Sequence, residues 1–374
     1  MASTKGTNLI DLLGEIDDPR KPSNGTLHDF REILVIAIAA VLSDCDTVED
    51  IAFWARTKET WLRRFLVLKH GIPSEETFLR VLQALDPKQF EDTFRRWVSG
   101  IVGRLGGTVA IDGKTVRGSG SGDEVAIHMV SAFATELGLV IGQEKIADKS
   151  NEITAIPELL DALYLKGCLV SIDAIGCQKA IAHKIIARHG DYLLAVKGNQ
   201  PTLQDALETA FIDCADRAEV DRHNRVDKSH GRTVGQIASV LPAHEIVDET
   251  IWPKCRTVGR IDSLRFVGDK ESELEQRYYI SSRVLTAADL AIAARAHWGI
   301  ENRLHWVLDV SMSEDASTLR KNNAPQNLSL LRKIALNLIR SAPPPTRKTS
   351  LRLRRKGAAW DDDQRILLLG ITPL

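Results

Sequence analysis

The sequence predicts a mixed α/β protein, in which a helical N-terminal unit precedes a mixed sheet that is covered by helices and carries a β-rich insertion. Three features support this fold class. Apolar residues recur at helical spacing through residues 8–105. From residue 106 onward, short apolar segments of strand length alternate with segments of helical spacing. Between about 222 and 285 the pattern is strand-like and broken by turns, which indicates the insertion.

The N-terminal unit is predicted to be all-helical. The apolar run Ile33–Leu42 predicts a buried helix. Ser74 stands before two glutamates, which favours a helix start because a hydroxyl and carboxylates suit the positive end of a helix. The last helix is expected to end at Gly106-Gly107. Its large apolar residues lie on one face: Phe90, Phe94, Trp97, Val98, Ile101, Val102 and Leu105.

The pattern of residues 106–342 predicts the order β-β-β-α-β-α-β. We expect strands at 108–112, 126–135, 139–146, 168–173 and 192–197, with helices at 153–163 and 178–189. In the insertion, strands are expected at 233–241, 245–252, 257–267 and 278–281. Further helices are expected at 201–216, 287–298 and 324–340. Three prolines end the last of these, and residues 343–374 are expected to form a tail that is first basic and then acidic.

Composition narrows the class of protein. The chain has 374 residues and 44% hydrophobic residues, enough for a core in each of two or three units. Its net charge is −1, so any contact with nucleic acid must use local basic patches. Five cysteines without C-x-x-C spacing argue against a zinc ribbon or a disulfide scaffold. The longest apolar run is too short to span a bilayer, and we expect a cytoplasmic protein without a membrane partner.

Two aspartates suggest a metal site. Asp112 ends the strand TVAID, and Asp173 ends the strand CLVSID. Strand-end carboxylates can converge at one sheet edge, where their mutual repulsion favours a divalent cation such as Mg²⁺ or Mn²⁺. Two such ions can support phosphodiester displacement, and that chemistry needs a third carboxylate, for which Glu301 in HWGIEN is the candidate. The alternative is that each aspartate is a helix cap or turn residue and that Glu301 is a solvated helix residue.

Longer strings around these residues carry a family resemblance. They are AIDGKTVRGS around Asp112, KSNEITAIPELL at 149–160, SIDAIGCQKAIA around Asp173, YLLAVKGNQPTL at 192–203, RYYISS at 277–282, HWGIENRLHWVLDV at 297–310, EDAS at 314–317 and NAPQNLSLLRKIALNLIR at 323–340. Together they closely resemble the H-repeat-associated family of bacterial insertion-sequence transposases, a branch of the DDE superfamily. DLLGEIDDPR and the helices after it resemble that family's associated N-terminal domain, so the resemblance runs from about residue 8 to 342.

The resemblance implies both an architecture and an activity. It implies an RNase H-like catalytic core in which Asp112, Asp173 and Glu301 fill the three acidic positions. It also implies a transposase that binds the double-stranded ends of its element, with a homodimer as one arrangement on DNA, and that cleaves and transfers DNA strands. Two alternatives stay open: a catalytically impaired relic that still binds DNA, and a nuclease without strand transfer.

The sequence departs from related transposases at two places. Around the third acid, relatives carry a Tyr-x₂-Arg-x₃-Glu-x₆-Lys signature, whereas this chain has Ala294, His297 and Leu308 at those positions. We interpret HWGIEN as the version used by this branch. In HGRTVGQ at 230–236, uncharged residues stand where the family more often has charged ones, which would weaken a local DNA contact.

Several further residues are candidates for DNA contact, each with a structural alternative. Lys114 and Arg117 flank Asp112 and suit a phosphate contact or a surface ion pair. His297 and Trp298 suit base stacking or ordinary helix packing. The basic run of the tail suits phosphate contacts or simple solvation: Arg352, Arg354, Arg355 and Lys356. The segment that follows Lys197 lacks the pattern of an ATP-binding phosphate loop.

Overall fold

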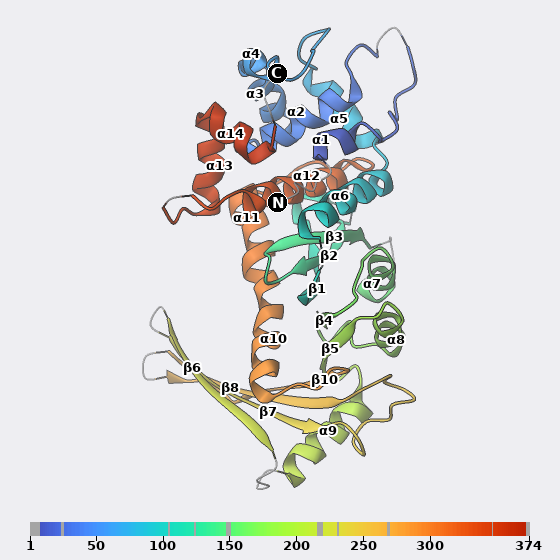
Figure 1. Cartoon of the computed structure of the whole chain (residues 1–374), viewed down its shortest axis with the longest axis vertical. Helices are drawn as coiled ribbons and strands as arrows, with labels where there is room; N and C mark the ends of the chain where they lie inside the picture. Colours follow the sequence, from blue (N-terminus) through green and yellow to red (C-terminus); the bar gives the residue numbers. More distant parts are fainter. Residues whose placement is uncertain are drawn as a thin grey trace, which may run out of the picture.

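A computed structural model describes residues 8–23, 26–103, 105–122, 125–146, 151–214, 220–229, 232–267, 270–345 and 347–371. The molecule is elongated (Figure 1): the N-terminal and C-terminal helices lie together at one end, a mixed sheet occupies the middle, and the insertion forms the other end. One long helix, α10, runs from the insertion toward the helical end and crosses the sheet on the way.

The helical end is built around α2 (Phe30–Leu42), a helix buried along nearly its whole length. Asp29 caps its N-terminus by accepting a hydrogen bond from the Glu32 amide. Such an apolar helix needs neighbours on all sides, and it packs against helices from both ends of the chain. The other N-terminal helices are α1 (Leu9–Leu13), α3 (Val48–Thr57), α4 (Glu59–Leu62), α5 (Glu75–Ala84) and α6 (Pro87–Val102).

The central sheet begins with five strands in the spatial order β3-β2-β1-β4-β5. Antiparallel pairs join β1 to β2 and β2 to β3, while β1, β4 and β5 run parallel. Helices α7 (Glu152–Asp161) and α8 (Lys179–Ala187) pack on this region. The strands are β1 (Gly107–Thr115), β2 (His128–Ala134), β3 (Leu139–Lys145), β4 (Cys168–Ile172) and β5 (Asp191–Val196), and a short helix, η1 (Arg117–Ser119), follows β1.

The insertion extends the same sheet. Strand β10 pairs with β5 and carries the order on through β8, β7 and β6, so the mixed sheet has ten strands in the described part of the chain. The strand expected at 245–252 is wrong: this segment forms turns, with Asp248 accepting hydrogen bonds from the Thr250 amide and hydroxyl. The bounds are α9 (Pro201–Asp213), β6 (Asp221–Ser229), β7 (Arg232–Pro242), β8 (Thr257–Val267), β9 (Lys270–Glu271) and β10 (Glu275–Ser281).

Helix α10 (Ala287–Ile300) covers one face of the sheet. Thr286 and Asp289 form a capping box at its start. Its apolar residues pack on β4, β5, β7, β8 and β10 in a second hydrophobic core. The helix continues through a π-helical turn, η2 (Glu301–His305), into α11 (Trp306–Met312). Such turns are uncommon and occur often at functional sites.

The C-terminal segments complete the helical end. Helix α12 (Ala324–Ser341) packs against α2, α5, α6 and β3, so it joins the N-terminal helices to the sheet. Instead of a solvated tail, the residues after the prolines form α13 (Leu351–Trp360) and α14 (Asp362–Leu369), which pack on α2 and α12. No helix in the described residues is long and apolar enough to cross a membrane.

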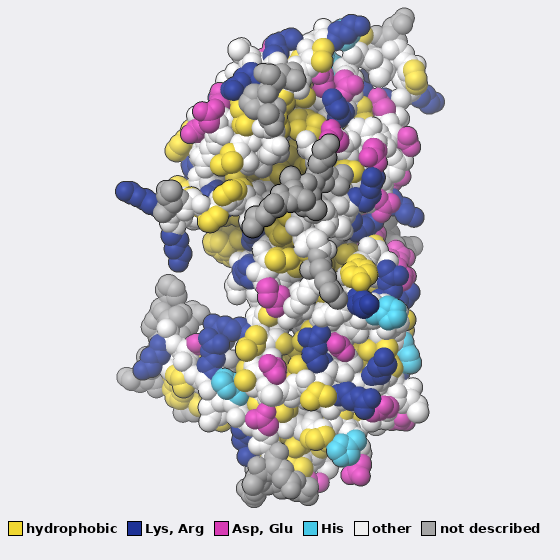
Figure 2. All heavy atoms as spheres, viewed as in Figure 1, with side chains coloured by type: hydrophobic (Ala, Val, Ile, Leu, Met, Phe, Trp, Pro, Cys, Tyr) yellow, Lys and Arg dark blue, Asp and Glu magenta, His cyan; other side chains and the backbone are white. Residues whose placement is uncertain are grey.

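The surface mixes charges of both signs. Figure 2 shows Lys and Arg side chains interspersed with Asp and Glu over this face, and the outline is hollowed between the C-terminal helices and the insertion. This distribution agrees with the net charge of −1. A polyanion must therefore be recognised by particular grooves and not by the overall field.

Candidate metal centre

Asp112 and Asp173 each follow the last residue pair of the parallel strands β1 and β4; β1 itself does not end at Asp112 as expected but continues to Thr115. Ile111 pairs with Ile172 in the register of β1 and β4, so the residue after each isoleucine is an aspartate. Adjacent strands are about 4.8 Å apart, and equivalent positions point to the same face. Asp112 Oδ1 accepts a hydrogen bond from the Gly113 amide at 2.9 Å, and Asp173 Oδ1 accepts one from the Gly176 amide at 3.3 Å. The backbone therefore helps to orient both carboxylates.

The third carboxylate, Glu301, comes from the start of the π-helical turn. His305 Nδ1 lies 3.5 Å from Glu301 Oε2 and 3.6 Å from Asp112 Oδ2. Ligand-type atoms of these three residues all lie within 4.8 Å of one another. The Glu301 side chain is 58% exposed and the His305 side chain only 6%, so the cluster opens to solvent on the side of Glu301.

The ionisation of the acids reflects their crowding. Burial, followed by the charges of Glu301 and Asp173, raises the pKa of Asp112 to about 8. Burial also raises the pKa of Asp173. The hydrogen bond from His305 lowers the pKa of Glu301 despite its partial burial. Carboxylates that cannot all ionise without a counter-charge are typical of a site that takes a proton or a cation.

The donor set fits a divalent ion. Two carboxylates and an imidazole nitrogen converge in the cluster, and Asp173 supplies a further negative charge beside it. Carboxylate oxygens suit Mg²⁺ and Mn²⁺, and an imidazole can complete the set for Mn²⁺ or orient Glu301 for Mg²⁺. His305 Nε2 is buried and has no hydrogen-bond partner among the described residues. The ring is thus held mainly through its Nδ1 contacts with the two acids.

Of the three predicted acids, the structure brings Asp112 and Glu301 together, with His305; Asp173 lies outside this cluster, after the neighbouring strand β4. The structure also places two residues, His305 and Glu152, that the sequence does not assign to the site at or beside it. The sequence pattern groups His305 with the aromatic residues, although its spacing of four from Glu301 on a helix could have indicated a partner. Nothing in the sequence pattern singles out Glu152. Its Oε1 lies 2.8 Å from His128 Nε2, the pair sits against Gly113, and its charge helps to raise the pKa of Asp112 and Asp173.

The basic residues near Asp112 differ in their surroundings. Lys114 is nearly buried and its Nζ lies within ion-pair distance of Asp309, Glu314 and Asp315. Carboxylates of the protein therefore neutralise the positive charge of Lys114, which favours the ion-pair alternative over a phosphate contact. Arg117 has an exposed side chain, and its Nε lies 3.5 Å from Asp315.

His297 and Trp298, which precede Glu301 by four and three residues, lie in different surroundings. A ring nitrogen of His297 donates a hydrogen bond to the Ser171 carbonyl on β4, and burial lowers its pKa to about 4. The ring thus faces the sheet, which favours packing over base stacking. Trp298 is 47% exposed on the other side of α10.

The basic run of α13 contains one residue that cannot contact DNA in this structure. Arg355 is fully buried: it donates hydrogen bonds to the Val41 carbonyl and to Asp46 Oδ1. The expected phosphate contact of Arg355 is therefore wrong, because the guanidinium caps the C-terminal end of α2. Arg352 is exposed, whereas Arg354 and Lys356 are half-buried.

Comparisons with known proteins match two family models to successive parts of the chain. A family model described as "Transposase DDE domain" matches residues 104–338, and one described as "DDE_Tnp_1-associated" matches residues 10–98. The solved structure of a piggyBac transposase synaptic complex with hairpin DNA covers 96% of this chain and 76% of its own, with a TM-score of 0.44 and 9% identity, too low to establish a shared fold.

Curated relatives match nearly end to end. "Putative transposase YncI" of Escherichia coli O157:H7 is 41% identical over 345 residues, which cover 89% of this chain and 87% of the relative. "H repeat-associated putative transposase YhhI" of Escherichia coli strain K12 is 40% identical over 343 residues, which cover 89% and 90%. On these matches, the chain belongs to the family of transposases with a DDE domain, within its H repeat-associated branch.

Proposed function

We propose that this transposase binds the double-stranded ends of an insertion sequence, cleaves them in a metal-dependent reaction, and joins the freed ends to target DNA. The observation that carries the proposal is the convergence of Asp112 and Glu301, with Asp173 on the neighbouring strand. Membership of the DDE transposase family supports the same reaction class. We also propose that the protein works as a homodimer on DNA, since an element has two ends.

We further propose that β1–β5, with their helices and α10, form an RNase H-like core. The order β3-β2-β1-β4-β5 supports this, with an antiparallel edge of three strands followed by two parallel strands. The acid on β1 then lies in the middle of this group, next to the acid after β4. Helix α10 crosses the same face and supplies Glu301.

The chemistry would consist of two in-line displacements at phosphorus. In the first, water attacks the phosphate at the element's end and the 3′ oxygen leaves; in the second, that 3′-OH attacks a target phosphate and displaces another 3′ oxygen. A bound Mg²⁺ or Mn²⁺ would polarise the phosphate and neutralise the developing charge. Asp112 and Glu301 would hold the ion, Asp173 would contribute charge or a second ligand, and His305 would orient Glu301. No protein nucleophile is required, because positioning and electrostatics supply the catalysis.

Basic residues outside the centre are proposed to hold the DNA backbone. Arg117 and Arg352 are exposed, and Arg354 and Lys356 are half-buried at the surface of α13. The impaired-relic alternative rests on the altered segment at 230–236. Its first two residues lie outside the described residues, and Thr233, Gly235 and Gln236 lie in β7.

The test is cleavage of a labelled duplex made from the DNA that flanks the gene, including its inverted repeats. We expect Mg²⁺ or Mn²⁺ to support cutting and Ca²⁺ to support only binding, since Ca²⁺ tolerates looser coordination geometry. Glu301→Gln, Asp112→Asn and Asp173→Asn should each lower cleavage at least about 100-fold, the loss expected when one electrostatic catalytic group is removed. Glu249→Gln is the matched control, because Glu249 is similarly exposed and lies on the insertion away from the centre.

The outcomes separate the alternatives. Wild-type cutting by Glu301→Gln would remove Glu301 from the centre. Binding without cutting by the wild-type chain, on an end sequence confirmed by a functional relative, would identify an impaired relic. Cutting without joined products would identify a nuclease.

A further inference from the structure

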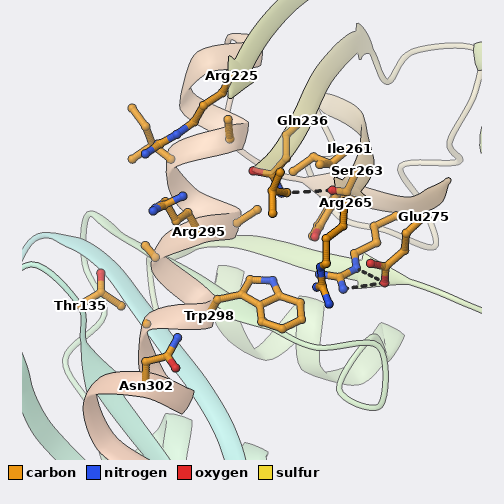
Figure 3. Close-up of a pocket in the computed structure, with 18 of the residues that line it drawn as sticks. Thr135, Arg225, Gln236, Ile261, Ser263, Arg265, Glu275, Arg295, Trp298 and Asn302 are labelled. Carbon is orange, nitrogen blue, oxygen red and sulfur yellow. Dashed lines mark hydrogen bonds and ion pairs between the residues drawn. The ribbon is translucent and has the colours of Figure 1, made fainter. Parts of the chain in front are cut away.

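A large groove lies beside α10, on the side of the helix that faces the insertion. Its volume is about 1080 Å³. One wall is made by α10 and the start of η2, from Ala291 to Arg303, and the other is made by β7, β8 and β10. Figure 3 shows side chains from both walls pointing into the same space, with Trp298 between them. We call this hollow the α10 groove.

Arginines dominate the charge of the α10 groove. Five of them line it, against three glutamates: Arg225, Arg265, Arg277, Arg295 and Arg303, against Glu136, Glu273 and Glu275. The acids offset only part of this charge. Glu136 accepts hydrogen bonds from the Thr108 amide and the Thr135 hydroxyl, so it is already engaged by the protein.

The arginines of the insertion and of α10 are incompletely paired. Arg225 and Arg295 share one carboxylate, that of Asp227, at 3.0 Å and 2.5 Å. Arg265 is exposed and forms no ion pair within the described part of the chain. Guanidinium groups that lack their own carboxylate are suited to bind phosphate.

Trp298 gives the α10 groove an aromatic surface. It is 47% exposed, and the Arg277 guanidinium stacks over its ring at 4.2 Å from the ring centre. Glu275 accepts hydrogen bonds from that guanidinium, at 2.9 and 2.6 Å, and so fixes the stack. A half-exposed tryptophan beside arginines offers an aromatic face and positive charge to a ligand that has both flat apolar faces and negative charge.

The α10 groove lies close to the metal centre along the helix. Trp298 precedes Glu301 by three residues, about 4.5 Å of helix rise, and Asn302 and Arg303 also line the groove. A strand held there would pass within one helical turn of the candidate catalytic acids.

We propose that the α10 groove binds an unpaired DNA strand next to the cleaved phosphate, with Trp298 stacking on a base and Arg225, Arg265 and Arg295 contacting phosphates. An aromatic platform inside a positively charged groove is the combination that proteins use for single strands. A duplex presents its phosphates but keeps its base faces stacked, so it would leave the tryptophan unused. This inference rests on the proposed function, in that the strand belongs to the DNA that the metal centre would process.

The test measures binding without cleavage, in Ca²⁺. Fluorescein-labelled dT20 and a random 20-base-pair duplex serve as probes, titrated at several salt concentrations. We expect Trp298→Ala to weaken dT20 binding about tenfold, within the range for removal of one base–aromatic stack, and Trp298→Phe to restore most of it. Arg265→Ala combined with Arg295→Ala should weaken dT20 binding and flatten the log–log salt slope by about 0.7 for each phosphate that the protein no longer neutralises.

Arg256→Ala is the matched control. Its side chain is 54% exposed and forms one ion pair, while that of Arg295 is 56% exposed and also forms one. Both lie in or beside the insertion, but Arg256 does not line the α10 groove. We therefore expect this control to leave dT20 binding unchanged. Melting curves of every variant identify any that fail to fold, and Trp298→Phe keeps the test available if Trp298→Ala does not fold.

The outcomes distinguish this inference from the proposed function. Equal weakening of duplex and dT20 binding in the arginine variant would overturn the assignment to an unpaired strand. If none of the groove substitutions changed dT20 binding, the α10 groove would be ruled out as the binding site for an unpaired strand. The proposal of metal-dependent cleavage would be unaffected. Cleavage abolished in Glu301→Gln with normal dT20 binding supports both proposals, because the centre and the groove are then separable.

Discussion

Three arginines from the C-terminal third meet the C-terminal end of α2, and this contact explains why they are buried. Arg355 donates to the Val41 carbonyl, Arg332 to the Asp46 carbonyl, and Arg365 to the Ser43 hydroxyl. The last carbonyls of a helix have no partner inside it and carry partial negative charge. The Arg355 guanidinium satisfies one of them, the Val41 carbonyl, while Arg332 and Arg365 bind the segment just after α2; the carboxylates of Asp44 and Asp46 supply counter-charge to Arg355.

We predict that Arg355→Met lowers the free energy of unfolding by ~3–5 kcal/mol, the usual cost of breaking a buried charge pair by removing one partner. The substitution leaves the Val41 carbonyl and Asp46 without their donor. Arg352→Met on the same helix is the control, because Arg352 is exposed, and it should change stability by less than about 0.5 kcal/mol. Urea unfolding measures both, and equal values for the two variants would contradict the assigned role.

At the level of single residues, the sequence identifies the acids but not the surroundings of the basic side chains. Asp112 and Asp173 are recognisable because each follows an apolar segment of strand length and stands in a family string. The burial of Arg355 could not be predicted, since neighbouring arginines in LRLRRK look alike and only the turn of α13 toward α2 selects one. The spacing of four residues between Glu301 and His305 could have indicated their contact, whereas no local pattern predicts the π-helical turn that carries both residues.

Helix α6, strand β3 and helix α12 share a buried polar cluster between the N-terminal unit and the sheet. Lys333 donates hydrogen bonds to Gln143 and to Ser329. Glu91, on α6, is fully enclosed and makes no hydrogen bond in the described residues. Burial raises its pKa from 4.5 to about 8, against the nearby charges of Arg95 and Lys333. Folded protein therefore retains a proton on Glu91 that the unfolded chain has released near neutral pH.

This proton predicts a pH dependence. A pKa raised by folding contributes stability that is fully present below the unfolded pKa near 4.5 and is lost as pH rises through about 8. We expect Glu91→Gln to gain stability relative to wild type between pH 5 and pH 8, by on the order of a few kcal/mol. The measurement is the unfolding free energy at each pH, with Glu59→Gln as control, because the Glu59 side chain is 38% exposed and already paired with Arg63. Parallel curves for wild type and Glu91→Gln would rule out the raised pKa.

The elements of the sheet are largely predictable from the sequence, but their order is not. The strands β1–β5 lie where apolar runs of strand length occur, within a few residues. Strand β6 could not be predicted, because its sequence DRHNRVDKS does not alternate apolar and polar residues. The strand is stabilised by its pairing with β7. The false strand at 245–252 has spaced apolar residues, but Ile246, Val247 and Trp252 pack from turns.

At the scale of the whole molecule, the predicted domain boundary at residue 105 does not separate two cores. Helix α12 lies more than 200 residues later, yet it fills the N-terminal unit. The Asn327 amide donates to the Leu82 and Leu85 carbonyls of α5 and its end. No local pattern could reveal this, because amphipathic spacing shows that a helix has an apolar face but not which distant segment will cover it.

We therefore predict that residues 8–105 do not fold cooperatively alone. In isolation the fragment would expose the apolar surface of α2 that α12, α13 and α14 cover, and it would leave the Val41 and Asp46 carbonyls, at and just after the end of α2, without their arginine donors. Fusing residues 320–371 to the fragment through a glycine-rich linker should restore a single sharp thermal transition, because it returns the buried arginines and α12 to their sites. The measurements are melting by circular dichroism and dispersion of amide signals in NMR spectra. The matched control is the same fusion with Arg332→Met and Arg355→Met, which keeps the length and apolar surface but removes the donors to α2. A sharp transition for 8–105 alone would show that the N-terminal unit is an independent domain, and a control as stable as the parent fusion would show that apolar contact, not the arginines, completes it.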